Sequence, residues 1–234
     1  KDERLKTDLI TNVSHDIKTP LTSIINYVDL LKRENIQDSK IQGYLDILEA
    51  KAQRLKHLTE DVVEASKISS GNITMEYMNI NFVEMINQTT GEFTEKFEKR
   101  NLQIVLNVPE KPVMVRTDGR RMWRVIENIY NNAAKYALEG TRVYADLIEK
   151  EHTVEFSLKN ISEQPLNISA DELTERFIRG DVSRSTEGSG LGLSIAKNLT
   201  ELQGGKFELY LDGDLFKVTI VFPKAVVGQS VTKP

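Results

Sequence analysis

Cysteine is absent from the 234 residues of this chain, and no apolar run approaches the length that a bilayer requires. The first absence excludes disulfide bonds and thiolate chemistry, and it permits a cytosolic location. The second leaves no candidate for a membrane-spanning helix, which needs about 18 to 20 consecutive apolar residues. A signal-peptide pattern is also missing. The chain nevertheless begins on a helical pattern, KDERLKTDLI, without an initiating methionine, so we expect that an upstream part has been removed.

The chain has no excess of positive charge. Its formal net charge is −4, so the charge balance does not favour nucleic acid or an anionic membrane as the main partner. Apolar residues make up 39% of the chain and charged residues 28%, which is ordinary for a globular protein. The length suffices for one large or two modest domains.

Residues 1–68 predict two helices and no strand. Apolar residues recur at steps of three and four from Ile10 to Leu31, and again from Ile41 to Val62. The short polar segment ENIQDSK between these stripes predicts an antiparallel helical hairpin. Each stripe is wider than one helix–helix seam, and a second copy of the hairpin would cover the surplus. We therefore expect a homodimer built on a four-helix bundle, with packing against another part of the protein as the alternative.

A hinge-like break at 69–72 separates the hairpin from a region of mixed pattern. Because strands and helices do not alternate regularly there, we expect an α+β two-layer sandwich with a mixed sheet and one helical layer over 73–225. A flexible tail is expected over 226–234. The sequence predicts strands over 73–80, 102–108, 113–117, 142–150, 153–161, 207–213 and 215–222. It predicts helices over 82–99, 120–137 and 194–203, with Asn81 as the N-terminal cap of the first.

The segment SHDIKTPLTSI places a proline inside the first predicted helix. Pro20 removes a helical hydrogen bond, at a cost of about 3 kcal/mol, and predicts a bend. His15 lies about 200° around the axis from the apolar stripe, which predicts an imidazole exposed to solvent. Thr19 follows on the same helix face, and Asp16 is close enough to orient the ring obliquely. A plain surface histidine beside a tolerated proline is the alternative.

NVSHDIKTPLTSI resembles the phosphoacceptor segment of the sensor histidine kinases of two-component systems. The resemblance implies that His15 takes the γ-phosphoryl group of ATP and passes it to an aspartate on the receiver domain of a response regulator. It also implies that Asp16 assists in acid–base chemistry and that Thr19 orients water in the reverse phosphatase reaction. His57 and His152 match nothing in this family, and we expect them to be structural or surface residues.

A second candidate segment is RVIENIYNNAAKYA, in which Arg124, Asn128, Asn132 and Lys135 share one helix face. Amide oxygens suit a Mg²⁺ ion that keeps most of its ligands from phosphates and water, and lysine supplies a point charge for phosphate. A solvated polar face is the alternative. In TEGSGLGLSIAKNL, glycines stand directly before a helix, where the backbone can approach an anion. This glycine pattern is neither a P-loop nor a dinucleotide fingerprint.

Together, these two segments resemble the ATP-binding domain shared by histidine kinases, DNA gyrase, Hsp90 and MutL. The resemblance implies that Asn132 ligates Mg²⁺ and that Asn128 lies on the phosphate side. It further implies a phosphate contact from Lys135 and a place in the nucleotide pocket for Tyr136. The similarity to histidine kinases covers about residues 5–223.

The lid region of that family is also represented, with one departure. ELTERFIRGD resembles the lid segment that contains a characteristic phenylalanine, here Phe177, and GSGLGL resembles the glycine-rich lid end, with Gly188, Gly190 and Gly192. Where the family carries Asp-x-Gly-x-Gly, this chain reads LKNISEQPLNI. Asn160 stands in the place of the aspartate that binds the adenine amino group. Its carbonyl oxygen can still accept that bond, without the added strength of a charge.

The resemblance thus implies the cytoplasmic transmitter portion of a histidine kinase that uses ATP and Mg²⁺. A dimerisation and phosphoacceptor domain over 1–68 would precede an ATP-binding catalytic domain over 73–225. The partners implied are a second copy and a response regulator, with membrane attachment only through an upstream sensor region of the parent protein. Two alternatives remain open. The first, which Asn160 favours, is a scaffold that binds a regulator without phosphorylating it. The second is an ATP-driven clamp like gyrase or Hsp90, in which His15 would have no function.

Overall fold

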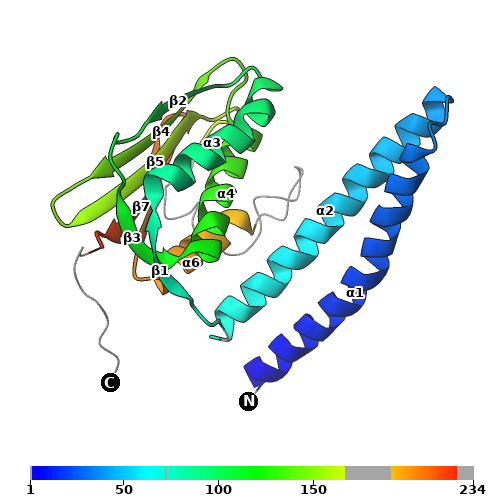
Figure 1. Ribbon diagram of the computed structural model, residues 1–234, viewed down its shortest axis with the longest axis horizontal. Helices are drawn as coiled ribbons and strands as arrows, with labels where there is room; N and C mark the ends of the chain where they lie inside the picture. The colour runs from blue at the N-terminus through cyan, green and yellow to red at the C-terminus, as the bar shows by residue number, and fades with distance from the viewer. Residues whose placement is uncertain (1, 72, 167–190, 226–234) are drawn as a thin grey trace. The chain divides into compact units, whose positions relative to one another are not determined.

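The computed structural model describes residues 2–71, 73–166 and 191–225, with side chains from Val13 onward. These residues belong to two compact units, a helical hairpin at the N-terminal end and a sheet-containing unit that begins at Thr74 (Figure 1). Each unit is described separately below. In the described part of the chain, no helix is both long enough and apolar enough to cross a membrane.

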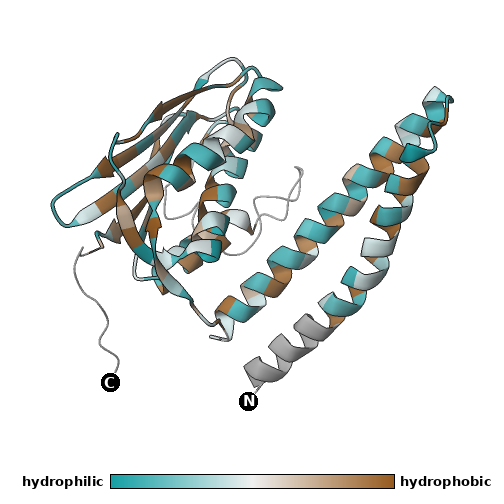
Figure 2. Cartoon of the chain, in the orientation of Figure 1, coloured by the Kyte–Doolittle hydropathy of each residue, from teal (hydrophilic) through white to brown (hydrophobic). Residues whose placement is uncertain are grey.

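The hairpin consists of α1 (Asp2–Arg33) and α2 (Ser39–Ser69), as the two apolar stripes predict. Apolar residues recur along both helices in Figure 2. The seam between the helices buries Leu21 and Val28 of α1 and Leu45 and Ala52 of α2. This seam uses only part of the apolar surface, and the remainder stays exposed.

The turn end of the hairpin is held by polar contacts. Asp38 caps α2, because its Oδ1 accepts hydrogen bonds from the backbone N–H groups of Lys40 at 2.8 Å and Ile41 at 3.3 Å. Lys32 of α1 reaches across to α2, where its Nζ lies 2.9 Å from Asp46 and 2.6 Å from Glu49. These contacts fix the register of the two helices at the loop.

Pro20 lies inside α1, which continues through it without a break. Figure 1 shows α1 curving along its length instead of running straight. Proline removes the N–H that would bond the carbonyl of Asp16, and its ring crowds that carbonyl, so a bend one turn after His15 has a local cause.

The second unit contains a five-stranded mixed sheet with the strand order β2-β4-β5-β7-β6. Its first pair, β2 (Gln103–Asn107) and β4 (Arg142–Glu149), is parallel, and the other pairs are antiparallel. The remaining strands are β5 (Thr153–Ile161), β6 (Lys206–Asp212) and β7 (Leu215–Pro223). A separate antiparallel ribbon pairs β1 (Tyr77–Asn81) with β3 (Met114–Asp118). The central strand of the five is β5.

Helices α3 (Phe82–Glu98), α4 (Gly119–Tyr136) and α6 (Gly192–Leu202) cover one face of this sheet (Figure 1). The strands alternate accordingly, as β7 shows by burying every second side chain toward the helices. The helix side of the core includes Met122, Ile126, Ile129 and Ala133 of α4, all at most 2% exposed. The predicted two-layer arrangement with one helical layer is therefore confirmed.

Local sequence signals mark the ends of the helices, whereas the first strand differs in length from the prediction. Asn81 caps α3 by accepting from the N–H of Val83 at 3.2 Å, and Gly204, with φ of 80°, follows the end of α6. The first strand is shorter than expected, beginning at Tyr77 and not at residue 73. The predicted tail, residues 226–234, lies outside the described residues.

Candidate functional site

His15 stands on the exposed side of α1, as its offset from the apolar stripe predicts. Its side chain is 79% exposed, and its Nδ1 lies 3.6 Å from Oδ1 of Asp16. That separation is longer than a hydrogen bond and fits the oblique approach expected for an adjacent residue. Thr19 donates its hydroxyl hydrogen to the backbone oxygen of His15 at 3.3 Å. The hairpin therefore presents an accessible imidazole with a carboxylate beside one ring nitrogen.

Asn128 occupies an unusual position in α4, because it is 8% exposed although its helix face is polar. Its amide nitrogen Nδ2 is buried without a hydrogen-bond partner. An unpaired buried donor costs about 1–3 kcal/mol, so a native structure that retains one calls for an explanation. A ligand that accepts a hydrogen bond at this point would remove the cost.

Gly192, the first residue of α6, lies against the side chain of Asn128. A Cβ atom added to Gly192 would lie 3.2 Å from Asn128 Oδ1, closer than side-chain carbons ordinarily pack. A glycine at this position therefore keeps space open around the Asn128 amide. The structure thus brings together residues from two of the predicted segments, α4 and the glycine-rich stretch.

The last turns of α4 carry the other predicted phosphate-side residues. Asn132 is half-buried, one turn after Asn128. The ammonium of Lys135 lies 4.7 Å from the centroid of the Tyr136 ring, a cation–π contact between neighbours. Arg124, on the same face, pairs with Glu127 at 3.1 Å.

Asn160 lies near the end of the central strand β5 and is 3% exposed. Its Nδ2 donates to the backbone oxygen of Ile161 at 3.1 Å. The side-chain oxygen Oδ1 is thereby left as the acceptor, which is the role that an adenine amino group would require.

Backbone contacts join the ends of α4 and β5. Ala137 and Ser162 form an isolated antiparallel bridge, with Leu138 N donating to Ile161 O and Glu163 N donating to Tyr136 O, each at 2.8 Å. Asn160 and the Lys135–Tyr136 pair are therefore held at adjoining ends of the two elements. Phe177, Gly188 and Gly190, named above as lid residues, lie outside the described residues.

The matches to known families decide the identity of the chain. The model of the His Kinase A (phospho-acceptor) domain matches residues 5–71. The model of the histidine kinase-, DNA gyrase B-, and HSP90-like ATPase matches residues 117–226. This chain belongs to the histidine kinases of two-component systems.

Curated relatives and solved structures agree with that assignment. The sensor protein VanSC of Enterococcus gallinarum is 32% identical over 225 residues, which cover 95% of this histidine kinase chain and 62% of the relative. The chain therefore spans less than two thirds of that protein. Full-length ShkA in complex with AMPPNP matches with a TM-score of 0.76 at 19% identity. The match covers 95% of this chain and 47% of the ShkA chain. ThkA in complex with the response regulator TrrA matches with a TM-score of 0.63 at 22% identity, over 96% of this chain and 64% of the ThkA chain. At these identities the structural likeness concerns the fold alone.

Sequence patterns did not single out Asp118, which fixes the start of α4 in this histidine kinase. Its Oδ1 accepts from Arg121 N and its Oδ2 from Glu76 N, each at 3.0 Å. Burial alone would raise the pKa of Asp118, but these backbone donors outweigh it and hold the pKa below its usual range. Asp118 thus anchors the helix that carries Asn128. The available signal was an aspartate two residues before the predicted start of this helix at residue 120.

Proposed function

We propose that this chain is the transmitter portion of a histidine kinase that moves the γ-phosphoryl group of ATP onto His15 and then onto an aspartate of a response regulator. The observation that carries the proposal is the buried, unpaired Asn128 amide beside Gly192, in a chain whose phosphoacceptor hairpin exposes His15. ShkA, solved with AMPPNP, and ThkA, solved with a response regulator, support it by analogy of fold.

The chemistry follows from which ring nitrogen is free. The Asp16 carboxylate lies 3.6 Å from Nδ1, and on closer approach it would accept a hydrogen bond from Nδ1–H and leave the lone pair on Nε2. Nε2 forms a bond to the γ-phosphorus as the bond from that phosphorus to the β–γ bridging oxygen breaks, and ADP leaves. Such a transfer depends on positioning and charge neutralisation more than on covalent chemistry from the protein.

The nucleotide-side residues divide the remaining work. Asn128 would donate to a phosphate oxygen through its unpaired Nδ2, and Lys135 would add a positive charge. Asn132 would offer an amide oxygen to Mg²⁺, which when bound neutralises phosphate charge. Asn160 would accept from the adenine amino group through Oδ1, and Thr19 would orient water when a phosphorylated regulator is hydrolysed.

The test is incubation of the chain with Mg²⁺ and γ-labelled ATP. A phosphorus–nitrogen bond to histidine is labile to acid and stable to alkali, so the expected adduct survives base and is lost in acid. The neutral Asn160 favours a second candidate, a scaffold that binds a regulator without phosphorylating it. Absence of both labelling and ATP binding in the presence of Mg²⁺ would favour the scaffold and contradict the kinase.

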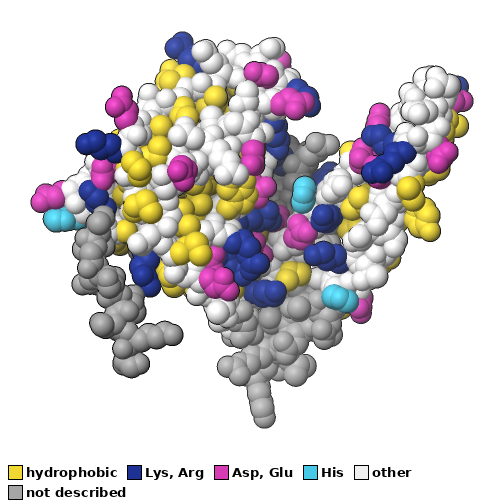
Figure 3. All heavy atoms as spheres, in the orientation of Figure 1, with side chains coloured by type: hydrophobic (Ala, Val, Ile, Leu, Met, Phe, Trp, Pro, Cys, Tyr) yellow, Lys and Arg dark blue, Asp and Glu magenta, His cyan; other side chains and the backbone are white. Residues whose placement is uncertain are grey.

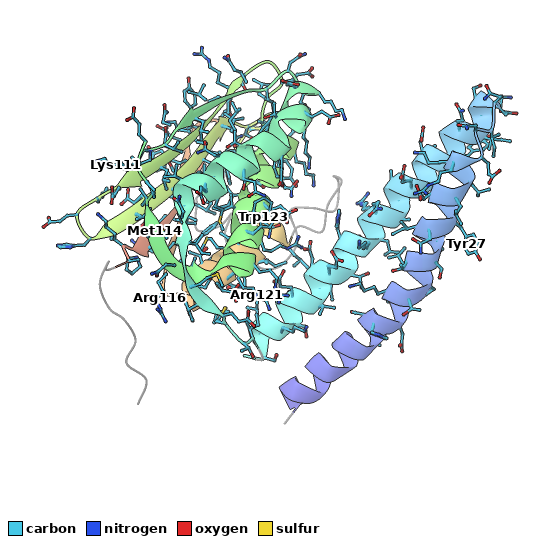
Figure 4. The ribbon with its side chains drawn as sticks, viewed as in Figure 1. Tyr27, Lys111, Met114, Arg116, Arg121 and Trp123 are labelled. Atoms are coloured by element: carbon cyan, nitrogen blue, oxygen red, sulfur yellow. The ribbon has the colours of Figure 1, made fainter. Side chains whose placement is uncertain are left out.

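We further propose that the hairpin forms a four-helix bundle with a second copy. Large apolar side chains remain exposed along it, and Figure 3 shows hydrophobic side chains at its surface. Tyr27, 69% exposed, points away from α2 in Figure 4. The exposed stripe comprises Ile17, Ile24 and Leu31 on α1 and Ile41, Leu48, Leu55 and Val62 on α2, with exposed fractions of 40% to 51%. Such a stripe is costly in water, at about 25 cal/mol per Å² of apolar surface.

Sedimentation should therefore show a dimer at micromolar concentration. Ile24→Asp places a charge in the exposed stripe and should weaken the dimer by at least roughly tenfold, because the charge would be buried without a partner. Asn26→Asp, an exposed polar position on the same turn, is the matched control and should leave the dimer intact. A monomeric wild-type chain at tens of micromolar would rule out the bundle.

A further inference from the structure

Arg100 makes contacts that no sequence pattern indicated. It lies in the turn that follows α3, where Arg100 N donates to Phe97 O at 3.0 Å. Its Nη1 donates to Ala134 O at 3.0 Å and also to Lys135 O. These are carbonyls of the last turn of α4, which lack helical N–H partners. A guanidinium at this end also carries the charge that the helix dipole favours.

The same guanidinium reaches a third element. Its Nη2 lies 3.0 Å from Oε2 of Glu163, just beyond the end of β5, and the Arg100 side chain is only 27% exposed. Glu163 N in turn donates to Tyr136 O as part of the Ala137–Ser162 bridge. One planar side chain with a forked set of donors therefore holds the end of α4 and the segment after β5 together.

The Ala137–Ser162 bridge includes a hydrogen bond to Ile161 O, the atom that also accepts from the Asn160 side chain. The backbone oxygen of Ile161 accepts from Leu138 N at 2.8 Å and from Asn160 Nδ2 at 3.1 Å. The pairing of Ile161 with Leu215 of β7 would still hold the strand. Loosening the bridge would instead remove the Leu138 N–H from Ile161 O, so that this carbonyl could tilt away from the Asn160 amide. With the amide in its present orientation, Oδ1 is the free acceptor, and no hydrogen bond in the described part of the chain reaches it.

We propose that Arg100 is a positioning residue for adenine selection. By clamping α4 to the segment after β5, it keeps Ile161 O in place, and Ile161 O turns the Asn160 side-chain oxygen toward its acceptor role. An aspartate has no such requirement, because both of its oxygens accept; an asparagine must be held in one of two orientations. This inference rests on the proposed nucleotide site, in which Asn160 faces the base.

The experiment compares two nucleotides that differ only in the adenine amino group. Calorimetry with Mg²⁺ gives the Kd of ATP and of purine riboside triphosphate, which lacks the 6-amino group. A neutral hydrogen bond corresponds to roughly a three- to tenfold preference for ATP in the wild-type chain. In Arg100→Met that preference should fall to within about twofold of unity, because the Asn160 amide is no longer held.

Further variants sharpen the comparison. Lys99→Met is the matched control, because Lys99 is adjacent and its ion pair with Glu95, at 2.7 Å, stays within α3 and its cap; its preference should equal that of the wild type. Arg100→Lys, which keeps the charge without the fork, should be intermediate. In Asn160→Ala the preference is already lost, so adding Arg100→Met should change it no further.

The possible results separate the two proposals. A wild-type chain that fails to bind ATP with Mg²⁺ contradicts the proposed nucleotide site, and the inference falls with it. A wild-type chain that binds ATP but shows no preference overturns only the role of Asn160 and Arg100. An Arg100→Met chain that is folded by circular dichroism and keeps the full preference overturns the positioning role, even where both affinities fall together.

Discussion

His15→Gln is expected to abolish phosphoryl transfer to the chain, lowering incorporation of label from ATP by at least about a thousandfold, to the limit of detection. Glutamine retains the length and polarity of the side chain but has no basic nitrogen with a free lone pair, so nothing remains to attack the γ-phosphorus. Because the His15 side chain is 79% exposed, the substitution should change the free energy of unfolding by no more than about 0.5 kcal/mol. The measurement is the label bound per chain after incubation with Mg²⁺ and γ-labelled ATP.

The chain supplies its own controls for this experiment. It has only three histidines, and the other two, His57 and His152, are also exposed. His57→Gln and His152→Gln should label as the wild type does. Thr19→Ala should also label normally, and should slow only the dephosphorylation of a regulator. Undiminished labelling of His15→Gln, or loss of label from either control, would show that the phosphoacceptor lies elsewhere.

The parts of the structure that were predicted correctly depend on neighbours in the sequence. The hairpin follows from apolar spacing, and exposure of His15 follows from its angular distance from the stripe, which a helix fixes geometrically. Asn81 was correctly placed as a helix cap because a cap acts on N–H groups only two or three residues away.

Contacts between distant segments could not be predicted in this way. Asn128 belongs to a polar stripe, and it is buried because the first residue of α6 packs against it. Arg100 binds carbonyls 34 and 35 residues away and a carboxylate 63 residues away, and any exposed arginine would give the same local pattern. The parallel pairing of β2 with β4 likewise depends on how α4 crosses the sheet. Tertiary packing decides each of these features.

Asn128→Leu should have opposite effects on stability and on nucleotide binding. Leucine has the same branching as asparagine, and it removes the buried Nδ2 that has no hydrogen-bond partner in the structure. The free energy of unfolding without nucleotide should therefore rise by about 1 kcal/mol. The affinity for Mg·ATP should fall by roughly a hundredfold or more, because an apolar side chain would face a phosphate oxygen that needs a donor. Urea unfolding and calorimetry measure the two quantities on the same preparations.

A neighbouring asparagine separates this explanation from a general effect of the substitution. Asn131 also lies on α4, but its Oδ1 accepts from Lys96 Nζ of α3, so its polar group already has a partner. Asn131→Leu should bind ATP as the wild type does and should gain no stability, since it breaks an existing contact. A loss of stability in Asn128→Leu would mean that the Asn128 amide is satisfied within the folded chain. Unchanged ATP affinity in Asn128→Leu would mean that the amide does not face the nucleotide. Only a stability gain together with a binding loss identifies an amide kept unpaired for its ligand.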